Sequence, residues 1–162
     1  MRRIALCVIL TAFIFAAFAP LAAAQDNPEY FVSLFKSFLR DIEQKNYVKA
    51  WDSMTVASKN WIAGAVTDAA NKQGKNVTRS EVYTLLENDA SGTRTTFFDS
   101  LNNGWTKDGF YQTMQAAKFT VKSVTKDRAV VNVMIANDSK DFQVWREGDT
   151  WKVNFFEDLM RD

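Results

Sequence analysis

The sequence lacks histidine and has a single cysteine, Cys7, among its 162 residues. Cys7 lies in an apolar run near the N-terminus that we expect to be removed, so the processed chain would contain neither residue type. Such a chain cannot form a disulfide, a thiolate or imidazole zinc site, a Cys or His nucleophile, or a Ser-His-Asp triad. We expect no metal and no cofactor, and acid–base chemistry would have to use carboxylates and tyrosines.

A strong excess of one charge is also missing. The chain has 20 Lys and Arg residues against 19 Asp and Glu residues, and removal of residues 1–24 would leave 18 against 19. Basic residues alternate with acidic ones, and no basic run is interleaved with aromatic residues. This distribution predicts no nucleic-acid partner and does not favour binding to an acidic membrane surface.

The one long hydrophobic run predicts an export signal. Arg2 and Arg3 precede an apolar segment over residues 4–18, which is followed by Pro20 and a small-residue sequence ending at Ala24. The segment is shorter than the roughly 20 residues that span a bilayer, and no positively charged stop follows it. We expect cleavage after Ala24, a periplasmic or secreted protein without a permanent membrane anchor, and one α+β domain over residues 25–162.

Helical periodicity begins at the start of the predicted domain, and the predicted helical part covers residues 29–115. Apolar residues recur at three- and four-residue spacing along the first predicted helix. They are Tyr30, Phe31, Leu34, Phe35, Phe38, Leu39 and Ile42. A second helix is predicted after Asn46 and a third from Ser58. The first stripe is typical of a helix that lies across a sheet.

The second half of the helical part is less regular. Thr78 and Glu81 match a capping box, which predicts the start of a fourth helix. A short fifth helix is expected to close at Gly104. Residues 105–115 fit either further helical turns or a loop, because Gly109 interrupts the apolar pattern.

Residues 117–156 show apolar residues at alternate positions in four short runs separated by turn residues. This pattern predicts an antiparallel meander with one face covered by the helices. The predicted core face consists of Phe119, Val121, Val131, Val133, Ile135, Phe142, Val144, Trp151, Val153 and Phe155.

Turn chemistry predicts a register for the last hairpin. Residues 148–149 form a two-residue turn with glycine first, a sequence that suits a hairpin. This turn places Val144 opposite Val153 and Phe142 opposite Phe155. All the large apolar partners then share one face.

Two further loops complete the predicted register. A two-residue loop at residues 138–139 would place Ile135 opposite Phe142. A three-residue loop at residues 126–128 would place Phe119 opposite Ile135. A two-residue loop there would place polar residues on the core face of the sheet.

Two segments carry a resemblance to a known family. Residues 46–51 form a tight second helix after the long first one, and residues 147–153 end the meander. Together they resemble the nuclear transport factor two-like superfamily, a cystatin-like α+β cone, most closely its small exported bacterial members. The resemblance covers residues 29–62 and 117–156 best. It implies a curved sheet around the first helix, an apolar cavity at the open end of the cone, and homodimers through the outer sheet face.

The first functional hypothesis is a non-catalytic module that binds a small apolar ligand or a protein partner. Aromatic residues make up 14% of the chain, and the resemblance implies that several lie near the mouth of the cone. The candidate ligand pocket consists of Trp51, Trp61, Tyr83, Trp105, Phe110 and Tyr111. Most of these side chains would pack in the core, and two or three would suffice for a pocket.

The outer face of the sheet is the candidate partner surface. Val130, Met134 and Trp145 would lie on it and could support a homodimer. A solvated face on which single apolar side chains are exposed is the alternative interpretation. A structural, homo-oligomeric envelope protein is a further hypothesis, because the near-neutral charge does not oppose self-association.

The second functional hypothesis is an isomerase or cyclase, whose activity would need an acidic base and a Tyr or acid donor in an apolar cavity. Asp52, Asp99 or Asp141 could serve as the base, with Tyr83 or Tyr111 as the donor. No spacing in the sequence selects among these groups, and the predicted register places Asp141 on the outer face.

Overall fold

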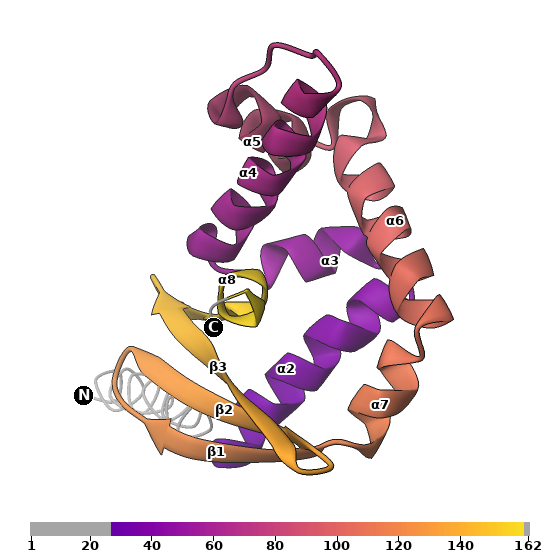
Figure 1. Cartoon of the computed structure of the whole chain (residues 1–162). Coiled ribbons are helices and arrows are strands. Elements are labelled where there is room, and N and C mark those ends of the chain that lie inside the picture. The colour runs from indigo at the N-terminus through magenta and orange to yellow at the C-terminus, as the bar shows by residue number, and fades with distance from the viewer. Residues whose placement is uncertain (1–26, 161–162) are drawn as a thin grey trace, which may run out of the picture.

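The computed structural model describes residues 27–160 and confirms an α+β fold, with helices followed by a four-stranded antiparallel sheet (Figure 1). The predicted signal peptide, residues 1–24, lies outside the described residues. In chain order the elements are α2 (Pro28–Glu43), α3 (Tyr47–Asp52), α4 (Val56–Lys72), α5 (Arg79–Glu87), the 3₁₀ helix η1 (Ala90–Gly92), α6 (Thr93–Lys107), α7 (Phe110–Ala116), β1 (Lys118–Val124), β2 (Arg128–Ile135), β3 (Asp138–Glu147), β4 (Thr150–Val153) and α8 (Phe155–Leu159).

Helix α2 is the predicted first helix, and it lies against the inner face of the sheet. Pro28 occupies its first turn, and the Asn27 side chain accepts a hydrogen bond of 3.0 Å from the Glu29 amide. The buried residues form the predicted stripe: Phe31, Phe35, Phe38, Leu39 and Ile42. Figure 1 shows α2 beside the sheet, with α4, α5 and α6 gathered at the opposite end of the molecule.

The later helices differ in part from prediction. The capping box of Thr78 and Glu81 is confirmed and opens α5. The predicted stop at Gly104 is wrong, because α6 continues through this residue to Lys107. The break comes instead at Gly109, whose φ of 72° suits glycine, and α7 follows it.

The last hairpin has the predicted register up to Val153. Val144 pairs with Val153 across the Gly148 turn. Strand β4 ends there because the backbone of Asn154 leaves the extended region, so the predicted strand pair of Phe142 and Phe155 is wrong. The two rings still meet, stacked with centroids 5.2 Å apart, because Phe155 opens α8 and points into the core.

The turn between β2 and β3 lies two residues earlier than predicted. Ile135 pairs with Asp138, and Phe142 pairs with Val131 instead of Ile135. Ala136, with a φ of 52°, takes the first turn position that glycine takes in the last hairpin. The partner of Phe142 moves by an even number of residues, so the same side chains of β2 and β3 face the core as predicted. Ile135 now lies at the exposed end of this inner face.

The β1–β2 connection contains a bulge that the sequence pattern did not indicate. The loop has the predicted three residues but spans residues 125–127, between Val124 and Arg128. The register shifts between Val121 and Ser123, and this irregularity returns Val121 to the inner face opposite Val131. The predicted pair of Phe119 and Ile135 is replaced by Phe119 and Val133.

A buried polar cluster, which we call the Asn154 clasp, joins the α3–α4 junction to the end of β4. The Asn154 carboxamide oxygen accepts hydrogen bonds from the hydroxyls of Thr55 (2.5 Å) and Ser58 (3.4 Å). The carboxamide nitrogen donates to Glu157 (2.7 Å) and Asp158 (3.1 Å). The clasp therefore satisfies polar groups that burial would otherwise penalise.

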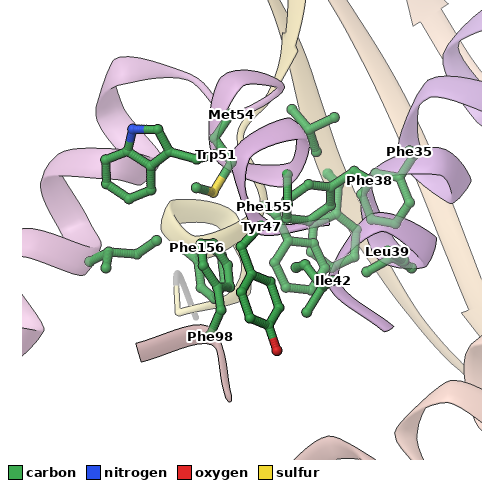
Figure 2. Close-up of a cluster of buried hydrophobic side chains, with 14 of the residues drawn as sticks. Phe35, Phe38, Leu39, Ile42, Tyr47, Trp51, Met54, Phe98, Phe155 and Phe156 are labelled. Carbon is green, nitrogen blue, oxygen red and sulfur yellow. The ribbon is translucent and has the colours of Figure 1, made fainter. Parts of the chain in front are cut away.

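The residues after the clasp enter the centre of the molecule. Phe155 and Phe156 project from α8 among side chains of α2, α3 and α6 (Figure 2). Phe155 contacts Phe35 and Phe38, with ring centroids 5.7 and 5.3 Å apart. Helix α8 thus links the sheet to the helical half of the core.

We expect Asn154→Ala to destabilise the fold by about 3 kcal/mol, because it leaves the buried groups of Thr55, Ser58 and Asp158 without their shared partner. Urea unfolding followed by circular dichroism measures this loss. Asn137→Ala, at an exposed turn, is the matched control and should change stability little. Equal effects of the two substitutions would contradict the role of the clasp.

We expect Ala136→Gly to stabilise the protein by about 0.5–1 kcal/mol, because alanine is strained at positive φ. The reciprocal change Gly148→Ala, at a φ of 61°, should destabilise it by a similar amount. Both values come from the midpoint of urea unfolding. A loss of stability in Ala136→Gly would show that the turn is not strained.

Candidate ligand-binding site

Helix α7 connects α6 to β1 and lies beside α2 (Figure 1). It is only seven residues long, and it lies between the positive-φ residue Gly109 and the extended Ala117. Its buried residues are Tyr111 and Met114. A groove lies on each side of this short helix.

The first groove, here the α7–sheet groove, has a volume of about 300 Å³ and is lined almost entirely by carbon atoms. Its walls come from α7, the β2–β3 hairpin and α8. The lining residues are Phe110, Met114, Val133, Ile135, Asp138, Ser139, Lys140, Phe142, Phe155 and Leu159. The Lys140 ammonium is engaged, since it donates to the Leu159 carbonyl at 2.7 Å. A surface of this kind suits an apolar ligand.

The second groove, here the α2–α7 groove, has a volume of about 290 Å³ and combines apolar with charged side chains. It is lined by Lys36, Leu39, Arg40, Glu43, Tyr111, Met114, Gln115 and Phe119. Met114 lines both grooves. The charged residues all come from the exposed side of α2.

Four of the six predicted pocket residues lie together around Phe156. The Trp61 and Trp105 rings both stack with the Phe156 ring, at centroid distances of 6.1 and 6.3 Å. Trp105 also stacks on Phe110 at 4.3 Å and meets Tyr111 edge-on at 5.9 Å. Phe110 lines the α7–sheet groove and Tyr111 lines the α2–α7 groove, so this aromatic group supports the grooves from behind.

The other two predicted pocket residues belong to a separate, closed contact. Trp51 is fully buried, and its indole nitrogen donates to Glu87 at 2.7 Å. Its ring centroid lies 6.3 Å from that of Tyr83, and the Lys59 ammonium lies over it at 5.1 Å. Burial and the charge of Glu87 raise the pKa of Tyr83. Trp51 and Tyr83 therefore line neither groove.

The prediction missed Met114, Ile135 and Leu159 as groove residues. Phe110 and Met114 are separated by one helical turn, a spacing that would have paired them had residues 105–115 been assigned to a helix. Ile135 was assigned to the core, but the shifted hairpin leaves it 37% exposed. No signal in the sequence placed the C-terminal Leu159 near β2.

The candidate acids do not converge on either groove. Asp99 accepts a hydrogen bond of 2.6 Å from the Tyr47 hydroxyl and lies 3.1 Å from the Lys45 ammonium. These two contacts lower the pKa of Asp99, so its carboxylate is a weak base. Asp52 is exposed on α3.

Asp141 lies on the outer face of the sheet, as its predicted placement required. It pairs with Asn132, whose side chain donates to it at 2.6 Å. The contact with Lys122, 2.8 Å away, lowers the pKa of Asp141. This carboxylate is therefore held in a charged surface cluster and not in an apolar cavity.

Tyr111, which lines the α2–α7 groove, and Tyr47 are held as neutral phenols. Burial and the hydrogen bond to Asp99 raise the pKa of Tyr47 to about 12. The Tyr111 hydroxyl donates to Asn102 at 2.6 Å, and burial together with the charge of Glu43 raises the pKa of Tyr111. Figure 2 shows the Tyr47 hydroxyl pointing away from the apolar cluster.

The candidate partner surface is not a continuous apolar patch. Val130 is buried, whereas Met134 and Trp145 are exposed. The polar pair of Asn132 and Asp141 lies between Met134 and the other two residues along the sheet. Trp145 is covered in part by Arg128, which lies 5.5 Å from its ring.

The fold and the grooves together describe an α+β protein with an apolar recess beside a short helix. The sequence matches no protein-family model, and comparisons with curated proteins and with solved structures also found no match. Across residues 27–160, no helix has both the length and the apolar character needed to cross a membrane. In the same part of the chain, no three acidic side chains gather as ligands for a metal ion.

Tyr47, Tyr83 and Tyr111 make stability depend on alkaline pH. Because their pKa values are raised above 10 in the folded protein, their contribution to stability is intact below about pH 10 and is lost as the pH rises toward about 12. We expect the urea midpoint to fall over this range, and Tyr47→Phe to reduce the fall. A midpoint that does not change over this range would contradict the prediction; phenolate absorbance gives the tyrosine titration independently.

Proposed function

We propose that this protein is a non-catalytic binding module that holds a small apolar ligand in the α7–sheet groove. The observation that carries the proposal is the lining of this groove, in which Phe110, Ile135 and Leu159 form walls of carbon at the surface. Exposed apolar side chains grouped in a concave site favour ligand binding over simple packing.

The size of the groove supports a small ligand. Its volume of about 300 Å³ lies at the lower end of the range for small-molecule pockets. Met114 is unbranched and flexible, so it can adapt to ligands of different shape. A single alkyl chain or a compact apolar ring fits these features better than a large cofactor does.

The acid–base alternative has less support. The α7–sheet groove is lined by Asp138 but by no tyrosine, and the tyrosine of the α2–α7 groove, Tyr111, already donates to Asn102. Export to the periplasm, membership of the nuclear transport factor two-like superfamily and a homodimer through the outer sheet face stay predictions. The proposed ligand binding requires none of them.

The test uses 1-alkanols from hexanol to dodecanol, titrated into the full chain by calorimetry. Ile135→Asp should weaken binding at least about tenfold, because a carboxylate at the mouth of an apolar groove loses hydration without gaining a partner. Ile135 is at the exposed end of β2, so the fold should tolerate the change.

The matched control is Met134→Asp, which places the same charge one residue away on the opposite face of β2. Its affinity for alkanols should equal that of the unmodified protein. Equal losses in both variants, or no binding of any alkanol by the unmodified protein, would refute the proposal. Native mass spectrometry of the protein purified from its own source should in addition show a bound apolar mass.

A further inference from the structure

We propose that the natural ligand is an anionic amphiphile, whose alkyl chain occupies the α7–sheet groove and whose head lies in the α2–α7 groove beside Lys36 and Arg40. This inference rests on the proposed function and specifies its ligand class. Three observations carry it: the two grooves adjoin, their chemistry differs, and the charged one contains unpaired cations.

The grooves meet at Met114. This side chain lines both of them, and the strand residues beneath, Phe119 in one groove and Val133 in the other, are paired partners on adjacent strands. The two grooves therefore share one apolar side chain and rest on paired apolar residues of adjacent strands. Methionine is flexible and adapts readily, so the Met114 side chain can yield to a chain that passes beneath α7.

The cations lie on one side of α2. Lys36 and Arg40 are one helical turn apart, and both are exposed. The Lys36 ammonium lies 4.7 Å from the centre of the Phe119 ring, and the Arg40 guanidinium donates to the Ser37 hydroxyl at 3.3 Å. Among the residues that the structure describes, neither forms an ion pair. Both can therefore receive an anion without breaking an ion pair.

Glu43 opposes an anion, and it lies two turns of α2 away from Lys36. It is on α2 one turn beyond Arg40, and its charge acts on the Tyr111 phenol. A head beside Lys36 and Phe119 is farther from Glu43 along α2 than a head beside Arg40 alone would be. Lys36 and Phe119 also line a further open groove of about 450 Å³ along β1, so the head stays accessible to water. The arrangement suits a carboxylate or another singly charged head on an alkyl chain.

The test compares dodecanoate, dodecanol and dodecyltrimethylammonium by calorimetry with the full chain. We expect dodecanoate to bind about tenfold more tightly than dodecanol, the gain expected from charge-assisted hydrogen bonds, and the trimethylammonium compound to bind most weakly. Lys36→Glu/Arg40→Glu should abolish the preference for dodecanoate and leave dodecanol affinity within about twofold.

Two further variants make the result specific. Lys49→Glu/Lys75→Glu changes the net charge equally at exposed positions outside the grooves, and it should keep the preference. Met114→Phe, which places a stiffer and bulkier side chain between the two grooves, should remove the preference for dodecanoate over dodecanol.

The outcomes separate this inference from the proposed function. If dodecanol binds but dodecanoate binds no better, the anionic head is refuted and apolar binding stands. If the preference persists in Lys36→Glu/Arg40→Glu, or is lost equally in Lys49→Glu/Lys75→Glu, the head does not lie at Lys36 and Arg40. If no compound binds the unmodified protein, the proposed function itself fails.

Discussion

Asn154 stands at the point where the sheet ends and the helical half of the core begins. Its side chain joins Thr55 and Ser58, at the start of α4, to Glu157 and Asp158 of α8. The backbone beside Asn154 is held as well, because the Thr55 amide donates to the Val153 carbonyl at 3.1 Å. A buried amide has few alternative partners, so satisfying it fixes where β4 stops and where α8 points.

The position of α8 determines the rest of the core and leaves the recess beside α7. Phe155 packs against α2 and the sheet, while Phe156 stacks with Trp61 and Trp105. These rings fill the centre of the molecule. Helix α7 has only seven residues, and a groove lies on each of its sides. The two grooves are thus a consequence of how the aromatic core is completed.

Local patterns predicted the parts of this fold that local interactions determine. The α2 stripe, the capping box at Thr78 and the Gly148 hairpin are set by periodicity, side-chain capping and turn chemistry. The end of β4 could not be predicted, because two of the partners of Asn154, Thr55 and Ser58, lie about a hundred residues away. The turn at Ala136 was missed since alanine rarely adopts positive φ. Met114 was missed as a groove residue because its neighbours in the grooves come from other elements, α2, β2 and α8.

The ionic contacts of the described chain explain why function is better sought beside α7 than at the acids. Asp99 is engaged by Tyr47 and Lys45, and Asp141 is engaged by Lys122 and Asn132. Each carboxylate is thus held in a contact at the surface. Because the pKa of each is lowered, each is a weaker base. The cations of α2 that border the α2–α7 groove have no such partner. The pairing of these acids, together with the unpaired Lys36 and Arg40, favours the proposed anionic ligand over an acid–base role for Asp99 or Asp141.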